Sequence, residues 1–184
     1  MLGSSYNNRT MRETLIDIKE RRSCRKYTQE PVAQDMLEAV LEAGTYAATG
    51  HGTQSPRMVV AREPGLVKKL SDMNAAVWGK PVDPFYGAPV AVIVFADTQA
   101  PTGRQDACLV MGNLMLAAHA VGLGSCWINR AREMFATPEG AEMLSSWGLD
   151  PAVYEGMGIC ILGHAAEGSL HPAKPRKPDY ITYL

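Results

Sequence analysis

The segment of residues 109–121 constrains the fold most, because it is apolar on nearly every side of the helix that it predicts. We expect this helix to span residues 103–121, with bulky apolar side chains at Leu109, Val110, Leu114, Met115 and Leu116. A helix of this kind has to be buried. The chain has 184 residues, enough for one domain with a sizeable core. In so small a domain we expect part of the helix surface to contact a second subunit.

Short apolar runs and turn signals predict the elements around this helix. We expect strands at residues 58–61, 90–96, 125–128 and 158–162. The spacing of Met11, Leu15 and Ile18 predicts a first amphipathic helix that ends near Arg21. Further helices are predicted over residues 35–48, from Pro64, and from the Thr137-Pro138 start to Gly148.

The composition changes after Gly163. Pro172, Pro175 and Pro178 alternate with basic residues, which excludes a core helix or a central strand. We therefore expect residues 164–184 to form an extended tail, with residues 180–183 available to pair at a sheet edge. Residues 1–10 are polar, and we expect them to be flexible. Residues 1–184 thus form a single domain, with no internal repeat.

The composition excludes several classes of protein. Apolar residues make up 46% of the chain, and the net charge of -1 argues against a nucleic-acid surface. No signal peptide and no membrane-spanning segment is visible. The four cysteines form no C-x-x-C pair and no zinc-type cluster with histidine, so we expect reduced thiols in a cytoplasmic protein without a metal site.

Common catalytic motifs are missing from the sequence. It contains no Walker A loop and no G-x-S-x-G elbow, and Gly122-Leu123-Gly124 precedes a strand, the reverse of the Rossmann arrangement. His119 lies in the apolar helix, so we interpret it as a core residue and not as a ligand. Cys126 has apolar neighbours, which raise a thiol pKa and disfavour a nucleophile.

Basic segments stand near both ends of the chain. The stretch Arg21-Arg22-Ser23-Cys24-Arg25-Lys26-Tyr27 and the tail residues Lys174 and Arg176 suit phosphate oxygens. A solvated helix end is the alternative for the first segment, since cations favour a helix C-terminus. Between them lies a polar loop, residues 49–56, which includes Gly52 and Gln54. Together these parts predict a site for a phosphorylated planar cofactor.

The ordered series of these segments resembles the FMN-dependent nitroreductase family, in its short single-domain form. The series consists of Arg21-Arg22-Ser23-x-Arg25-x-Tyr27, the loop with Gln54, residues 83–89, the long helix leading into Ser125-Cys126-Trp127-Ile128, and Pro175-Arg176-Lys177-Pro178. The match covers residues 14–178. No single piece is specific, but their ordered combination is.

The resemblance implies an α+β, three-layer fold with a mainly antiparallel central sheet, as a homodimer that exchanges its extended tails. It implies two FMN molecules at the subunit interface, with the Gln54 loop reaching the flavin of the partner. The resemblance also implies which residues bind FMN: Arg21, Arg22, Ser23, Arg25, Lys174 and Arg176 at the phosphate end, Gly52 and Gln54 from the loop, and Ser125, Cys126, Trp127, Ile128 and Asn129 along the ring.

The implied reaction takes a hydride from NAD(P)H onto the flavin and passes electrons to nitroaromatics, quinones or similar acceptors by a ping-pong mechanism. The flavin carries this chemistry, so no catalytic side chain is expected. Gly52 stands where the family often has Asn, which removes one side-chain hydrogen bond to the ring. A flavin-binding protein without turnover, and a dehalogenase or flavin-cleaving enzyme on the same scaffold, are the alternatives.

Overall fold

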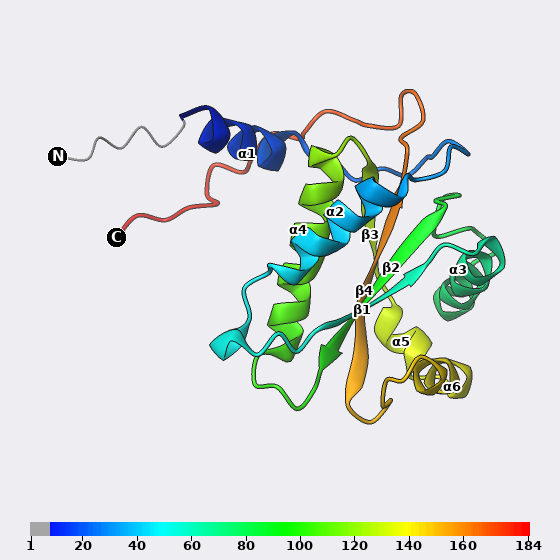
Figure 1. Cartoon of the computed structure of the whole chain (residues 1–184). Coiled ribbons are helices and arrows are strands. Elements are labelled where there is room, and N and C mark those ends of the chain that lie inside the picture. The colour runs from blue at the N-terminus through cyan, green and yellow to red at the C-terminus, as the bar shows by residue number, and fades with distance from the viewer. Residues whose placement is uncertain (1–7) are drawn as a thin grey trace.

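The computed structural model of the chain describes residues 8–184 and is built on one four-stranded antiparallel sheet (Figure 1). Its strands are β1 (Arg57–Ala61), β2 (Val90–Asp97), β3 (Gly124–Ile128) and β4 (Tyr154–Gly163). They lie in the order β1-β2-β4-β3, with every neighbouring pair antiparallel. The four strands predicted from the sequence are therefore confirmed, and β4 begins four residues earlier than expected.

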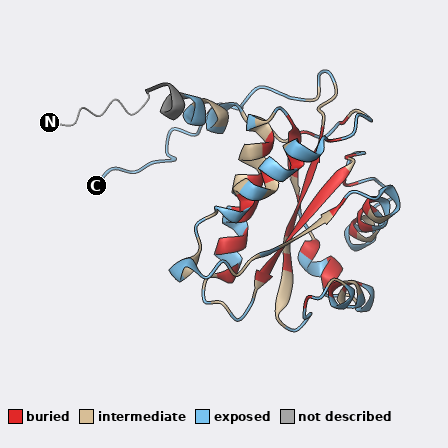
Figure 2. Cartoon of the chain, viewed as in Figure 1, coloured by how far each residue is buried: buried red, intermediate tan, exposed pale blue. Residues whose placement is uncertain are grey.

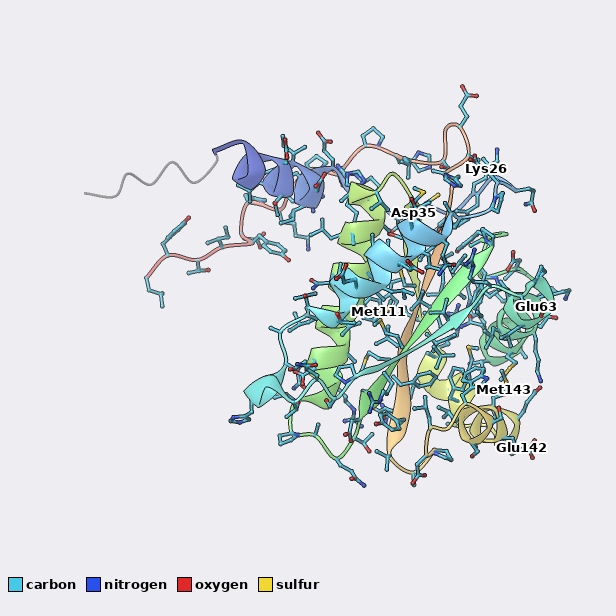
Figure 3. All side chains as sticks on the ribbon, in the orientation of Figure 1. Lys26, Asp35, Glu63, Met111, Glu142 and Met143 are labelled. Atoms are coloured by element: carbon cyan, nitrogen blue, oxygen red, sulfur yellow. The ribbon has the colours of Figure 1, made fainter. Side chains whose placement is uncertain are left out.

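Helices cover both faces of the sheet, which gives the expected three layers. Helices α2 (Gln34–Thr45) and α4 (Gly103–Ala120) lie on one face, and α3 (Pro64–Trp78), α5 (Ala131–Phe135) and α6 (Pro138–Ser146) lie on the other. The β2 side chains alternate between the two resulting cores, so this central strand is buried throughout except at its last residue (Figure 2). Met111 of α4 is fully buried in the layer that α4 shares with α2 (Figure 3).

Local capping explains where α3 and α6 begin. The carboxylate of Glu63 accepts hydrogen bonds from the amides of Gly65 and Leu66, and Pro64 occupies the first helical position. The Thr137 hydroxyl accepts from the Gly140 amide in the same way, ahead of Pro138. The predicted Thr137-Pro138 helix start is confirmed.

The short helix α5 was not predicted, and its packing explains the length of β4. A Cβ atom on Gly156 of β4 would lie 2.5 Å from the carbonyl oxygen of Ala131, at the start of α5. Glycine there lets α5 lie directly against the strand, and the strand continues through it to pair Tyr154 with Asp97. The sequence shows this glycine, but glycine weakens a strand interior and favours a bulge or the close approach of another backbone, so its presence did not predict a strand that begins before it.

The outer helix α1 (Asn8–Glu20) corrects one expectation. It ends next to Arg21 as predicted, but its apolar residues Leu15 and Ile18 are 53% and 55% exposed within the single chain. The side chain of Met11 lies outside the described part of the structure, as do residues 1–7 of the segment 1–10 that we expect to be flexible, and residues 8–10 are the start of α1. Leu109 of α4 is also half exposed. The chain therefore presents apolar side chains on α1 and α4 that it does not cover itself.

The tail is extended, but it does not add a strand to the sheet. Residues 180–184 are exposed, so the predicted pairing of residues 180–183 at a sheet edge is wrong for the single chain. In Figure 1 the tail runs from the end of β4 back past α1.

The interpretation of His119 as a core residue is also corrected, because its imidazole is partly exposed and lies 3.9 Å from the Asp17 carboxylate of α1.

Candidate cofactor-binding site

The basic stretch lies along the outer edge of β3. Ser23 pairs with Ser125 in a parallel bridge, and the Cys24 amide donates to the Ser125 carbonyl at 2.8 Å. On its other side the stretch contacts the start of the tail, because Tyr27 pairs with Ala165 and the Ala166 amide donates to the Lys26 carbonyl. Lys26 lies next to this part of the tail in Figure 3. Segments distant in the sequence thus meet at one corner of the sheet.

The buried Tyr27 fixes the conformation of this stretch. Its hydroxyl donates to the Cys24 carbonyl at 2.9 Å, which closes the turn that displays Arg25. Burial raises the pKa of Tyr27 well above its ordinary value, so the hydroxyl stays protonated and remains a donor. The serine and arginine side chains are therefore presented from a rigid support.

The arginines of this stretch are not equivalent. Arg22 donates from Nη1 to the carbonyl oxygens of Lys19 and Arg21, both at 2.7 Å. Nη1 of Arg21 and Nε of Arg22, by contrast, are buried and have no partner among the described residues. A buried donor without an acceptor costs about 1–3 kcal/mol. Unpaired guanidinium donors on a stretch that also carries a serine hydroxyl suit a phosphate or carboxylate ligand, and the phosphate site stays a prediction.

Cys126 lies under this stretch and is not an activated thiol. Burial raises the pKa of the Cys126 thiol. Three effects oppose this rise only in part: the positive charge of Arg25, a hydrogen bond with Ser23, and the positive charge of Arg21. Burial also raises the pKa of Cys160 on the neighbouring strand. Both thiols stay protonated near neutral pH, which agrees with the expectation that Cys126 is no nucleophile.

The rest of β3 offers a backbone edge. Past Ser125, no other strand pairs with the outer edge of β3 in the described part of the chain. Ser125, Cys126 and Ile128 are buried, Trp127 is partly buried, and Asn129 is exposed directly after the strand. The Trp127 ring lies on Gly158 of β4, and its buried Nε1 has no partner among residues 8–184. Backbone groups that no strand pairs, on the strand that the basic stretch bridges, suit the polar edge of a flat ring.

The glycine-rich loop lies near the other end of α4. The Gly50 amide donates to the buried carboxylate of Asp106 at 3.1 Å, near the start of that helix. The Ser125 hydroxyl donates at 3.5 Å to the Met115 carbonyl of the same helix. Nine helical residues separate Asp106 from Met115, a rise of about 14 Å. Gly52 and Gln54 therefore do not join the arginines within one chain.

The loop has a defined backbone. Gln54 has a φ of 49°, its amide donates to the Thr49 hydroxyl at 3.1 Å, and its side chain is exposed. Gly52 has a φ of 67°, and a Cβ atom there would meet no atom within 4 Å. The loop thus presents Gln54 to solvent with open space beside Gly52.

Among the described residues, the tail residues Lys174 and Arg176 make no hydrogen bond to the basic stretch. Both are exposed, and the Arg176 guanidinium donates to the Lys174 carbonyl, from Nη2 at 2.7 Å and from Nε at 3.2 Å. The structure thus brings together Arg21, Ser23, Arg25 and the β3 residues. It leaves Gly52 and Gln54 at a separate place on the single chain, and it shows no hydrogen bond between the described tail residues Lys174 and Arg176 and this group.

The sequence reasoning missed three residues that support the end of β3. Asn74 of α3 is fully buried, and its side-chain amide donates to the Asn129 carbonyl at 2.7 Å. Arg130 follows with a φ of 76°, donates from Nε to the side-chain Oδ1 of Asn74 at 3.0 Å, and stacks on Trp78. An asparagine on the buried side of α3 was the only signal in the sequence. The left-handed backbone at Arg130 left no signal, because arginine rarely adopts it.

Neither a metal site nor a membrane-spanning helix is found in the described residues. No group of three or more His, Cys, Asp or Glu side chains is placed to hold a metal ion in that part of the chain. Over the same residues, no helix combines the length and the apolar character needed to cross a membrane.

Comparison with known proteins identifies the family. The family model described as the nitroreductase family matches residues 18–164. A curated relative, the FMN reductase [NAD(P)H] of Bacillus subtilis, is 27% identical over 192 residues, which cover 92% of this chain and 72% of the relative.

Solved structures agree with this result. A nitroreductase with bound FMN from Bacteroides fragilis is 29% identical with a TM-score of 0.85, and the match covers 94% of this chain and 98% of the other. A nitroreductase with bound FMN from Desulfitobacterium hafniense is 28% identical with a TM-score of 0.81, with the same coverage of 94% and 98%. The chain belongs to the nitroreductase family.

Proposed function

We propose that the protein is an FMN-dependent oxidoreductase that takes a hydride from NAD(P)H and passes electrons to nitroaromatics, quinones or similar small acceptors. The observation that supports this most is the buried Nη1 of Arg21, which has no partner among the described residues and belongs to the stretch that bridges β3 through Ser23. Both solved relatives compared above hold FMN, which carries a terminal phosphate and a flat ring. The donor set matches both ends of that molecule.

The side chains of this site bind and orient the cofactor. Arg21, Ser23 and Arg25 hold the phosphate, with Arg22 alongside and Lys174 and Arg176 reaching it from a tail. The β3 segment, Ser125-Cys126-Trp127-Ile128-Asn129, lies against the ring. When bound, FMN supplies the acceptance and release of the hydride. With the buried thiols of Cys126 and Cys160 protonated, nothing in this arrangement requires a catalytic side chain.

A homodimer completes the site in this proposal. Leu15 and Ile18 on α1 and Leu109 on α4 are apolar side chains that the single chain leaves half exposed. Two copies related by a two-fold axis near these side chains would bring the Gly52–Gln54 loop of one chain toward the arginines of the other. Obligate interfaces of this kind are large and apolar, often above about 2,000 Å². The loop residues, separate from the arginines in one chain, and the tail residues then belong to a site shared by both.

The finer mechanism and the location follow from the same proposal. One flavin face serves donor and acceptor in turn, so the kinetics are ping-pong and the acceptor range is broad. Initial rates at several fixed acceptor concentrations then give parallel double-reciprocal lines, and intersecting lines would indicate a ternary complex.

All four cysteines are free, which suits a cytoplasmic location.

An absorbance titration tests the function. The protein is loaded with FMN, and spectra are recorded without oxygen after addition of NADH and then of NADPH. Loss of the yellow flavin band, followed by its return when a quinone is added, supports the enzyme. A bound flavin that neither donor reduces supports a storage or sensing protein instead. Failure to bind FMN at micromolar concentrations would reject both.

A further inference from the structure

Two cations share the ring of Trp78, close to the end of β3. The Arg130 guanidinium carbon lies 4.4 Å from the centre of the indole ring, and Nζ of Lys80 lies 4.6 Å from it. Trp78 ends α3 and is 38% exposed, Lys80 follows the left-handed Gly79, and Arg130 lies between β3 and α5. We call Trp78, Lys80 and Arg130 the cationic platform.

Arg130 is held in place at a conformational cost. Its φ of 76° lies in the left-handed region, where a residue other than glycine is disfavoured by about 1 kcal/mol or more. Nε of Arg130 donates to the side-chain Oδ1 of the buried Asn74, and the side-chain Nδ2 of Asn74 donates to the backbone carbonyl of Asn129. Asn74 therefore fixes the guanidinium relative to the backbone at the end of β3. Strained residues held in this way are concentrated at functional sites.

The charges on this platform are not balanced. Among residues 8–184, Nη1 and Nη2 of Arg130 and Nζ of Lys80 make no hydrogen bond or ion pair, and no carboxylate pairs with either cation. The neighbouring Arg132 differs, because its Nε lies 3.4 Å from the Glu155 carboxylate. Two fixed positive charges with free donors on an aromatic surface form a site for an anion, most favourably for phosphate.

We infer that the cationic platform binds a phosphate group of the nicotinamide dinucleotide and so determines how well the donor is used. This inference depends on the proposed function, because Arg130 stands one residue beyond the β3 segment that we assign to the flavin ring. A dinucleotide whose nicotinamide reaches that ring has its phosphates at the border of the site. The 2′-phosphate of NADPH and the pyrophosphate present in both donors share this chemistry.

Donor kinetics with three reductants test the inference. Second-order rates of flavin reduction are measured for NADPH, NADH and N-benzyl-dihydronicotinamide, which carries no phosphate. Arg130→Asn removes the charge, and asparagine tolerates a positive φ. We expect this variant to lose about tenfold with a phosphate-bearing donor, as for one charged hydrogen bond at a partly exposed site. The rate with N-benzyl-dihydronicotinamide should stay within about twofold.

The pattern of losses identifies the phosphate. A loss with NADPH alone assigns the 2′-phosphate, and equal losses with NADPH and NADH assign the pyrophosphate. Lys80→Gln should give a smaller loss of the same pattern, since Lys80 is exposed and requires no refolding. Arg132→Gln is the matched control, because it removes an arginine two residues away that is already paired. Equal losses for all three donors, or unchanged rates for both Arg130→Asn and Lys80→Gln, would overturn the inference.

A binding measurement separates this inference from the proposed function. Calorimetric titration with NADP⁺ and NAD⁺ is carried out on the flavin-free and the FMN-loaded protein. If the wild type binds NADP⁺ or NAD⁺ and Arg130→Asn weakens that binding about tenfold, the platform is supported even where flavin reduction fails. If FMN binds and is reduced but Arg130→Asn and wild type bind both nucleotides equally, the platform is rejected while the oxidoreductase stands.

Discussion

The backbone amide of Gly50 donates a hydrogen bond to the buried carboxylate of Asp106, 56 residues further along the chain. The Thr102 hydroxyl donates to the same carboxylate at 3.0 Å. The hydrogen bond from Gly50 to Asp106 anchors the glycine-rich loop to the start of α4. It therefore fixes where the loop leaves the body of the domain.

Asp106→Ala should lower the free energy of unfolding by about 1–3 kcal/mol, because it leaves the Gly50 amide without an acceptor. Asp106→Asn keeps one acceptor oxygen and nearly the same volume, so its loss should be smaller. Urea unfolding followed by circular dichroism measures both. Equal losses for the two variants would show that the charge of Asp106 matters and that the hydrogen bond to the loop does not.

The arginine cluster predicts a strong preference for FMN over riboflavin. Arg21→Gln and Arg25→Gln should weaken FMN binding about ten- to a hundredfold, the equivalent of about 1.5–3 kcal/mol for a hydrogen bond to a charged group. Riboflavin lacks the phosphate, so its binding should change little. Titration by flavin fluorescence measures both ligands.

Arg22→Gln should weaken FMN binding less than Arg21→Gln, because Nη1 of Arg22 is already bonded to the Lys19 and Arg21 carbonyl oxygens and only its Nε lacks a partner among the described residues. Arg176→Ala tests the tail in the same titration and should resemble Arg25→Gln. If the variants weaken FMN and riboflavin to the same extent, the arginines support the fold and do not hold a phosphate.

The exposed apolar side chains on α1 and α4 predict a homodimer. Analytical ultracentrifugation of the wild type at low micromolar concentration should show one species of twice the 19.9 kDa chain mass. Leu109→Glu replaces one of these side chains with a charged one and should release monomers with weakened FMN binding. Val82→Glu changes an exposed apolar residue elsewhere and should leave the dimer intact. A stable wild-type monomer loaded with FMN would disprove the shared site.

The buried thiols predict a loss of stability at alkaline pH. Burial raises the pKa of Cys126 and of Cys160 in the folded protein above the ordinary value of about 8.5. The folded state thus keeps protons that the unfolded state releases. Stability is fully present below about pH 8.5 and falls as the pH rises beyond it, by up to about 1.4 kcal/mol per pH unit for each thiol.

Urea unfolding between pH 7 and 10.5 measures this effect. Cys160→Ala should show a shallower alkaline decline than the wild type, whatever its stability at pH 7. Cys108→Ala removes an exposed thiol and should leave the slope unchanged. An identical slope for Cys160→Ala would mean that the Cys160 thiol does not contribute.

The strands and long helices were predictable because their patterns are strong and local. The run of residues 90–96 is buried on both sides, as continuous apolar β-branched segments usually are. The Thr137-Pro138 start was equally clear, since an N-cap and a proline act on their immediate neighbours. The arginine stretch and β3 were found as separate motifs, and the structure shows them paired through Ser23 and Ser125.

The remaining features depend on contacts between distant residues. The start of β4 and the helix α5 require Gly156 and Ala131 to lie against each other, and neither position alone indicates the contact. Arg130 adopts a left-handed backbone only because Asn74 and Trp78 hold its side chain. The exposed Leu15 and Ile18 follow the expected helical spacing, but this spacing does not show whether the same chain or a second copy of it covers their side chains.

The contacts of Tyr27 with Ala165 and of Lys26 with Ala166 have a consequence for synthesis of the chain. The arginine stretch emerges from the ribosome early, but β3, β4 and the residues that hold it in place follow more than a hundred positions later. Until then its guanidinium groups have no fixed geometry and cannot select a phosphate. A cofactor that binds through this stretch therefore binds only the folded chain, and its binding raises the stability of the folded state.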